Sequence, residues 1–237
     1  MGRLRRLQPR RLRFAVALAA SRVALGDPRS LVCHHRAVED LVAFASRLVA
    51  AHPEVTSVEF AGSRSRGTHE ELSDWDFAVE TSDFGAVARD MPKLVAPLEP
   101  LGQQWEPLGH FPAYQVLMRG PTKIEFLFLD EAQDAMPPVR LSPRTLGAIN
   151  THFWDWIWWL TTKASAGHHD LVVEHMAQLY GHLLSPMGID MPPDSIDAAI
   201  AAFISRRDAL EREYGITLPR ALENEVLDGK RHVGDPS

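Results

Sequence analysis

Two aspartates spaced two residues apart, Asp74 and Asp76, have the type and spacing of metal ligands. They belong to residues 74–80 (DWDFAVE), where acidic or small residues alternate with apolar ones in the period of a half-buried strand. Alternate residues of a strand share a face, so both carboxylates can converge on one cation. Two carboxylates that lie so close repel each other unless a positive charge joins them, which favours a divalent metal.

A third acid, Glu125, lies in a stretch that predicts another strand over residues 123–129. Phe126 and Phe128 mark its buried face, and Glu125 lies on the opposite face together with Lys123. If this strand neighbours the strand over 74–80, three carboxylates form one cluster. Glu125 would then be a further metal ligand, or the base that takes a proton from an attacking hydroxyl.

Gly62 and Ser63 lie between a predicted strand over 55–61 (VTSVEFA) and the start of a helix. Glycine lets backbone N–H groups approach a phosphate closely, and the serine hydroxyl adds a donor. Arg64 and Arg66 follow, and both phosphate contacts and solvated charges are compatible with them. Phosphates held here could be bridged by Mg²⁺ to the two aspartates, as in metal-assisted phosphoryl or nucleotidyl transfer.

The ordered set, GSRSRGTHEELSDWD over residues 62–76 with a later strand acid, resembles the DNA polymerase β-like nucleotidyltransferase superfamily. It is similar in particular to the small bacterial antibiotic nucleotidyltransferases and to the minimal nucleotidyltransferases. The resemblance covers roughly residues 55 to 130, and the remainder agrees only in its helical character.

This resemblance implies a role for each matching position. Gly62 and Ser63 would hold a nucleoside triphosphate, Asp74 and Asp76 would bind the metals, and Glu125 would be the third carboxylate. In such families a lysine of the helical domain reaches the triphosphate, and Lys163 is the candidate here. Taken singly, each motif residue also has a structural explanation, as turn, helix cap or solvated strand residue. The ordered combination favours the site.

The pattern along the chain predicts an α/β (α+β) domain, residues 34–135, followed by an α-helical bundle domain, residues 140–228. The resemblance implies that the first is a nucleotidyltransferase domain with a mixed sheet. A periodic apolar pattern from His34 ends at Pro53, and Pro92 limits a helix from Phe84 to Met91. A further strand spans 113–118. Ser142 and Pro143 predict a helix start, and the helices expected are 143–164, 170–185, 194–213 and 219–226.

The helical half holds other candidates for binding. Residues 153–160 (FWDWIWWL) contain four tryptophans, which suit packing between the two halves or the lining of a pocket. Asp155 could contribute to an acceptor pocket. Lys163 near the helix end is also explained by the helix dipole. His168, His169, Asp170 and His175 match no established zinc spacing and are better interpreted as loop and cap residues.

Charge separates the N-terminus from the rest. Residues 1–13 hold six of the 25 basic residues and no acid, so the remainder carries 19 bases against 31 acids, a balance of -12. Residues 1–30 are a poor match to an export signal and are expected to be a disordered basic tail. The acidic body disfavours long nucleic acids as partners and favours a small or cationic one. No apolar run is long enough to span a bilayer, and the single cysteine suggests a reducing, cytoplasmic compartment.

The sequence therefore predicts a Mg²⁺-dependent nucleotidyltransferase, which moves a nucleotidyl group, AMP from ATP, to a hydroxyl of a small acceptor and releases pyrophosphate. A cationic acceptor such as an aminoglycoside fits the acidic body. Two alternatives stay open: an enzyme of antitoxin type that transfers AMP to a protein, and an inactive nucleotide-binding module. The partners expected are an NTP and a small molecule, with no membrane partner; a homodimer or a protein target is an open alternative.

Overall fold

The computed structural model describes residues 28–70, 72–120, 122–134 and 140–234, with side chains from residue 38 to residue 233 of these ranges. The residues from Val38 onward belong to one compact unit. The arginine-rich tail predicted over residues 1–30 lies almost entirely outside the described residues. None of the described helices is both long and apolar enough to cross a membrane.

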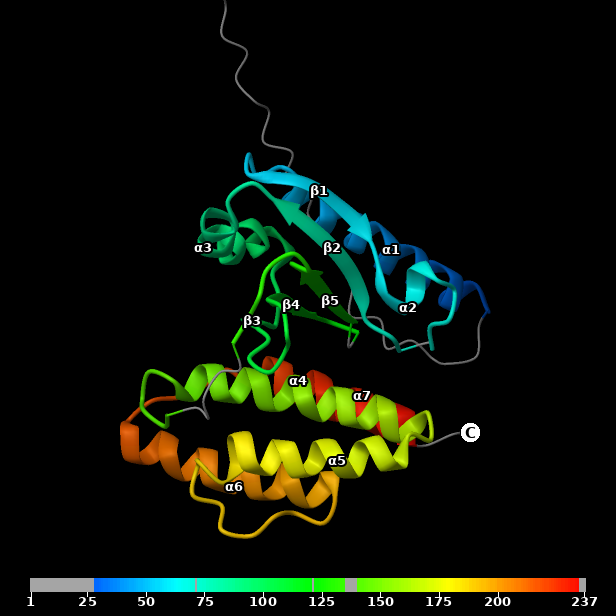
Figure 1. Ribbon diagram of the computed structural model, residues 1–237. Helices are drawn as coiled ribbons and strands as arrows, with labels where there is room; N and C mark the ends of the chain where they lie inside the picture. Colours follow the sequence, from blue (N-terminus) through cyan, green and yellow to red (C-terminus); the bar gives the residue numbers. More distant parts are fainter. Residues whose placement is uncertain (1–27, 71, 121, 135–139, 235–237) are drawn as a thin grey trace, which may run out of the picture. The chain divides into compact units, whose positions relative to one another are not determined.

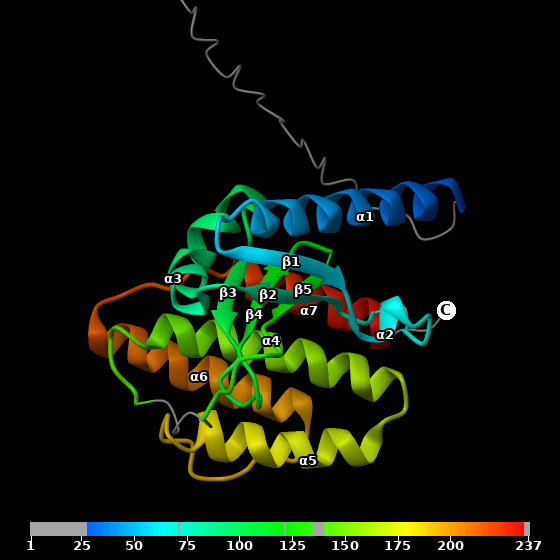
Figure 2. The ribbon, with the colours of Figure 1, turned by 45° about the horizontal axis from the view of Figure 1, so that its top comes forward.

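Five strands form one mixed sheet in the order β1-β2-β5-β4-β3 (Figures 1 and 2). The central pair, β2 and β5, is parallel, and the other three pairs are antiparallel. Together with the helices that follow, this mixed sheet confirms the predicted fold class. The strands are β1 (Val55–Phe60), β2 (Trp75–Thr81), β3 (Gly102–Trp105), β4 (Ala113–Met118) and β5 (Thr122–Leu127).

The two faces of the sheet differ because residues alternate along each strand. One face is apolar and contributes Phe77, Ile124, Phe126 and Val116 to a buried core. This core is completed by the C-terminal half of α1 (Pro28–Ala50) and by α3 (Phe84–Leu94). The opposite face carries the acids of the sequence motif, so the same alternation that buries the aromatic residues gathers the polar ones.

The C-terminal helices form a second core around α4 (Leu146–Ser165), which packs against β3 and three other helices. Figure 1 shows α4 between the sheet and helices α5 and α6. A helix with partners on several sides is apolar nearly all round, which accounts for its tryptophans. Trp154, for instance, is buried and meets the ring of Phe203 edge-on. The partners are α5 (His169–Leu179), α6 (Ile196–Tyr214) and α7 (Ala221–Gly234).

Several element bounds differ from the predicted ones. The helix α1 begins at Pro28, and α3 continues through Pro92, which lies in its last turn. Strand β3 was not predicted, because four half-buried residues with the sequence GQQW carry little alternation. Helix α4 begins at Leu146 rather than near Pro143, although the Ser142 hydroxyl does accept a hydrogen bond from the backbone N–H of Thr145. A π-helical turn, Tyr180–Leu184, follows α5.

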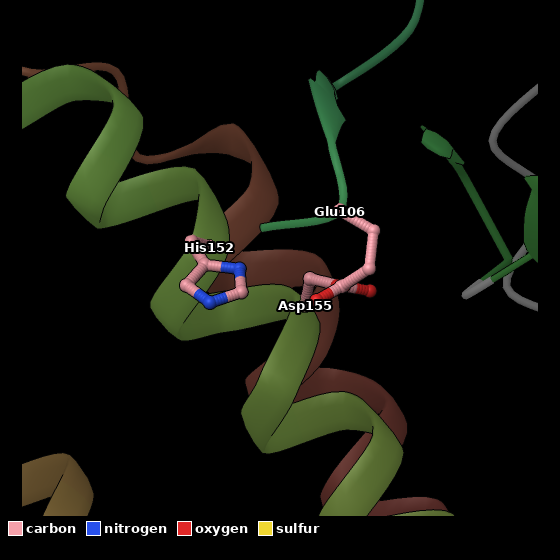
Figure 3. A group of neighbouring side chains, drawn as sticks. All are labelled: Glu106, His152 and Asp155. Atoms are coloured by element: carbon pink, nitrogen blue, oxygen red, sulfur yellow. The ribbon is translucent and has the colours of Figure 1, made fainter. Parts of the chain in front are cut away.

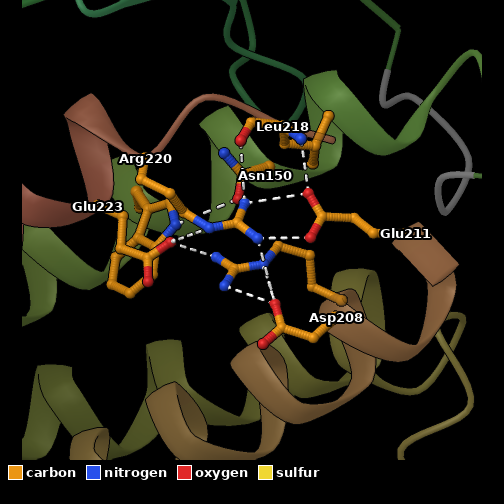
Figure 4. A network of polar contacts seen from close by, with 8 residues as sticks. Asn150, Asp208, Glu211, Leu218, Arg220 and Glu223 are labelled. Atoms are coloured by element: carbon orange, nitrogen blue, oxygen red, sulfur yellow. Dashed lines mark hydrogen bonds and ion pairs between the residues drawn. The ribbon is translucent and has the colours of Figure 1, made fainter. Parts of the chain in front are cut away.

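An ion network joins α6 to α7 and to the segment between them (Figure 4). The guanidinium of Arg207 is 2% exposed and binds Glu223 of α7, and it also contacts Asp208 at 2.8 Å. Arg220 binds Glu211, and the same carboxylate accepts the backbone N–H of Leu218 at 2.6 Å. A buried charge is tolerated only with partners, so this network holds the two helices in register.

We therefore expect Arg207→Met to lower the free energy of unfolding by about 3–5 kcal/mol, because it leaves the buried Glu223 with only its longer contact to Arg220, at 3.6 Å. Arg231→Met is the matched control: Arg231 is 69% exposed and pairs with Asp228 at the surface. Such exposed pairs contribute about 1 kcal/mol or less. Urea unfolding of the two variants measures both values, and an equal loss in both would contradict the importance of the buried network.

Candidate functional site

A row of polar side chains crosses the sheet on the face opposite the aromatic core. Asp76 of β2 is the register neighbour of Glu125 of β5, which in turn pairs with Gln115 of β4 and then Gln104 of β3. The predicted adjacency of the two acidic strands is therefore confirmed. The Gln115 amide donates to Glu125 Oε1 at 2.9 Å and lies 3.0 Å from Glu106 Oε2, and it accepts from Gln104 at 2.9 Å.

Lys123 occupies the next position of β5 on the same face. Its side chain is 5% exposed, and its ammonium lies 3.0 Å from Asp74 Oδ2 and 3.0 Å from Glu125 Oε1. A third carboxylate, Asp155 of α4, approaches to 3.5 Å. One buried cation thus joins the carboxylates of three chain segments: the residue before β2, strand β5 and helix α4.

Burial and the neighbouring charges shift the pKa values of the side chains in this cluster. Burial alone would lower the pKa of Lys123, but Asp155, Asp74 and Glu125 together raise it well above its ordinary value. Burial raises the pKa of Asp74 and of Asp155 to about 6, against the opposing effect of Lys123. Burial, followed by the charges of Glu125 and Asp74, also raises the pKa of Asp76 to about 6. One lysine therefore does not neutralise the cluster.

Gly62 brings the backbone against the Asp76 carboxylate. It has φ +68°, and a Cβ at this position would lie 1.7 Å from Asp76 Oδ2. Glycine is thus required both for the left-handed backbone and for the close approach. Ser63 follows in the short helix α2 (Gly62–Ser65), so the Gly-Ser pair and the acidic pair are side by side as the motif implies.

The predicted cationic residues lie around this centre. Arg66 is exposed, and its charge lowers the pKa of Asp76 in opposition to the acids. Arg64 stacks on the Trp75 ring, 4.2 Å from its centroid, and donates from Nε to the Ser73 carbonyl at 2.9 Å. Lys163 lies near the end of α4, 3.9 Å from Glu70 in the segment between α2 and β2. The structure thus places Lys163 beside that segment and Lys123 among the acids.

A cavity of about 350 Å³ opens between the polar sheet face and α4. Its volume is in the range of small-molecule sites. Its lining combines acidic with aromatic groups, among them Trp159 and His175, whose rings are tilted by 44° with their centroids 4.3 Å apart. Its main polar and aromatic lining residues are Asp74, Glu106, Gln115, Lys123, Glu125, His152, Asp155, Trp156, Trp159, His175 and Gln178.

Glu106, His152 and Asp155 have potential ligand atoms within 4.8 Å of one another (Figure 3). Burial lowers the pKa of His152 to about 3, so its imidazole is neutral. The amide nitrogen of Gln104, however, lies 3.2 Å from His152 Nδ1 and 3.3 Å from Asp155 Oδ2. This amide fills the space between the two side chains, and the group is better described as the polar wall of the cavity.

The acids of the motif are the better fit to a divalent cation. Mg²⁺ prefers carboxylate oxygens, and Asp74 and Asp76 supply two from one face. Five carboxylates lie in this region, with those of Glu106, Glu125 and Asp155 added, and the buried ammonium of Lys123 pairs with three of them, Asp74, Glu125 and Asp155. A bound divalent ion would neutralise negative charge at this place.

The sequence assigned no role to several residues of this site, among them Lys123, Gln115, Glu106 and His152. Lys123 was placed on the Glu125 face but given no role, although a lysine alternating with a glutamate on a half-apolar strand is a usable signal. Gln115 carried a weaker signal, as the one polar side chain that interrupts the apolar run of β4 on the acid-bearing face. Of the histidines, His168 and His169 mark the start of α5, as predicted, whereas His175 lines the cavity.

No protein-family model matches the chain, and no curated protein matches it by sequence. Several solved structures are similar to it, among them the following three. A cytoplasmic RNA terminal U-transferase is 14% identical over 44% of this chain, with a TM-score of 0.31. The polymerase core of TRAMP, an RNA surveillance complex, is 12% identical over 54%, with a TM-score of 0.33. An aminoglycoside 6-adenyltransferase from Bacillus subtilis is 10% identical over 83%, with a TM-score of 0.36.

The chain matches 30% and 40% of the length of the first two structures and 97% of the third. What the chain does is therefore inferred from the side chains of its own site.

Gly62→Ala and Gly67→Ala form a matched pair that tests the contact between Gly62 and Asp76. Both glycines have positive φ, +68° and +67°, but a Cβ at Gly67 meets no atom within 4 Å. Each variant should lose about 1–2 kcal/mol of stability from backbone strain. Only Gly62→Ala displaces the Asp76 carboxylate, so only it should weaken Mn²⁺ binding, by at least about tenfold, which is about 1.4 kcal/mol. Equal Mn²⁺ affinities in a titration would show that the contact is unimportant.

Divalent-ion binding should depend on pH in a range where ordinary aspartates do not titrate. Because the pKa values of Asp74 and Asp76 are raised to about 6, these groups gain protons as the pH falls through about 6. A proton competes with the metal, so Mn²⁺ affinity should be constant above about pH 7 and fall roughly tenfold or more by about pH 5. An affinity that stays level down to about pH 5 would contradict the raised pKa values.

Proposed function

We propose that this chain is a Mg²⁺-dependent nucleotidyltransferase that moves the nucleoside monophosphate of an NTP, AMP from ATP, to a hydroxyl of a small acceptor. The observation that carries the proposal is the pairing of Asp76 with Glu125 on adjacent parallel strands, with Gly62 in contact with Asp76. The acids of two strands therefore lie next to a turn of the kind that binds phosphate. This supports a site for a metal and a triphosphate together.

The NTP would lie along the turn that contains Gly62 and Ser63. The Asp76 carboxylate fills the space beside Gly62 that a Cβ would take, so a metal held by Asp76 would lie next to this turn, where the Ser63 hydroxyl offers a donor to a phosphate. Arg66 is exposed on the same turn and can contact phosphate oxygens. Lys163 would reach the triphosphate by leaving its contact with Glu70, which at 3.9 Å is a weak one.

Asp74 and Asp76 would hold Mg²⁺, which supplies charge neutralisation at the phosphates when it is bound. Glu125 would take the proton of the acceptor hydroxyl, since Lys123 and Gln115 fix the orientation of its carboxylate. The acceptor oxygen forms a bond to the α-phosphorus. The bond that breaks lies opposite and joins the α-phosphorus to the oxygen between the α- and β-phosphates. Pyrophosphate leaves, and the acceptor keeps the nucleoside monophosphate.

The cavity beside Glu125 would receive the acceptor. Its acidic wall of Glu106 and Asp155 favours a cationic molecule, and its indole wall of Trp156 and Trp159 offers flat apolar surface. An amino sugar of the aminoglycoside type combines these properties with hydroxyl groups. A long nucleic acid would bring its phosphates against the acidic wall, which is unfavourable.

Incubation with Mg²⁺, radiolabelled ATP and a panel of aminoglycosides tests the proposal. Label on a drug, with release of pyrophosphate, is the expected result. Label on protein instead would point to an enzyme that transfers AMP to proteins. Failure to bind ATP at all would point to a module without this activity and overturn the proposal.

Asp76→Asn should lower the rate of transfer by about 10³-fold or more, since several kcal/mol of charge stabilisation are lost and each 1.36 kcal/mol is a factor of ten. Glu80→Gln is the matched control: Glu80 lies on the same strand but is exposed. It should leave the rate within about twofold, and both variants should keep the far-ultraviolet circular dichroism of the parent chain. Undiminished turnover in Asp76→Asn would remove this residue from the metal site.

A further inference from the structure

Lys123 occupies the position that bridges two of the three motif acids. Its ammonium lies at equal distances, 3.0 Å, from Asp74 Oδ2 and Glu125 Oε1, and it is almost completely buried. A second metal ion joining the same two oxygens would have to lie within a few ångströms of this ammonium. Two cations that close repel each other strongly where water is scarce.

The Glu125 carboxylate already contacts hydrogen-bond donors of the protein itself. The oxygen that contacts Lys123, Oε1, also accepts the Gln115 amide at 2.9 Å. Gln115 is itself 3% exposed and belongs to the central strands, so this arrangement is rigid. The oxygen that a metal would share with Asp74 is therefore already bound by two donors.

Asp76 differs from the other two motif acids. Its carboxylate lies against Gly62, on the side of the turn that would carry the phosphates. Lys123 pairs with Asp74, Glu125 and Asp155, and Asp76 is not among these partners. A divalent ion held by Asp76 would take the other oxygen of Asp74, Oδ1, as its second ligand, because Lys123 already contacts Oδ2.

Many enzymes of phosphoryl transfer place two metal ions about 3.5–4 Å apart. We propose that in this chain Lys123 replaces one of them, so that the protein without nucleotide binds a single divalent ion at Asp74 and Asp76. Lys123 is then a positioning residue, and Glu125 is held by Lys123 and Gln115 instead of by metal. This inference rests on the proposed function, because it takes Asp74 and Asp76 to be metal ligands.

The stoichiometry of Mn²⁺ binding to the full chain without nucleotide tests the inference, with electron paramagnetic resonance as the readout. Asp76→Asn supplies the background from ions bound elsewhere. The expected difference between the parent chain and this variant is one ion per chain. A difference of two ions overturns the role of Lys123 and leaves the proposed function intact, whereas no difference overturns the metal assignment as well.

A double variant, Lys123→Met with Asp155→Asn, tests the same point from the other direction. Removal of the ammonium alone would leave three buried carboxylates without a cation and could unfold the chain, so one carboxylate is neutralised with it. The double variant should bind one Mn²⁺ ion more than Asp155→Asn alone. If the folded double variant binds no more Mn²⁺ than Asp155→Asn does, Lys123 does not occupy a metal position. If the double variant unfolds, the number of Mn²⁺ ions bound by the parent chain decides the question.

Discussion

The ammonium of Lys123 contacts carboxylates from three chain segments, and it joins the acids of the sheet to helix α4. A buried ion pair is costly to form, because both charges lose water, and still more costly to break from one side. Three carboxylates around one lysine leave little freedom in where α4 can lie over the sheet. Asp155, which belongs to that helix, thereby becomes part of the same electrostatic cluster as the motif acids.

The two-sided sheet is the second constraint. Phe77 and Phe126 fix the register of β2 and β5 by burying one face, and that register places Asp76 beside Glu125 on the other. A slip of one residue would turn the acids into the aromatic core. The stability of the core and the geometry of the site are thus consequences of the same alternation.

Much of this could be predicted from the sequence, because period-2 alternation and turn residues are local signals. The strands of Asp76 and Glu125, the face their acids share and the turn at Gly62 all follow from short stretches of chain. The bridge made by Lys123 could not be predicted, because it depends on how β5, the start of β2 and α4 meet in space. The cavity depends on the same packing, and β3 was missed because its four residues carry almost no pattern of their own.

The central claim is that the acids of β2 and the turn at Gly62 hold a metal and a triphosphate together. Crystals of the full chain with Mn²⁺ and a non-hydrolysable ATP analogue test it most directly, since manganese is located by its anomalous scattering. The expected result is an anomalous peak bound by Asp74 and Asp76, with the phosphates along Gly62 and Ser63. A nucleotide bound elsewhere, or manganese without contact to either aspartate, would contradict the claim.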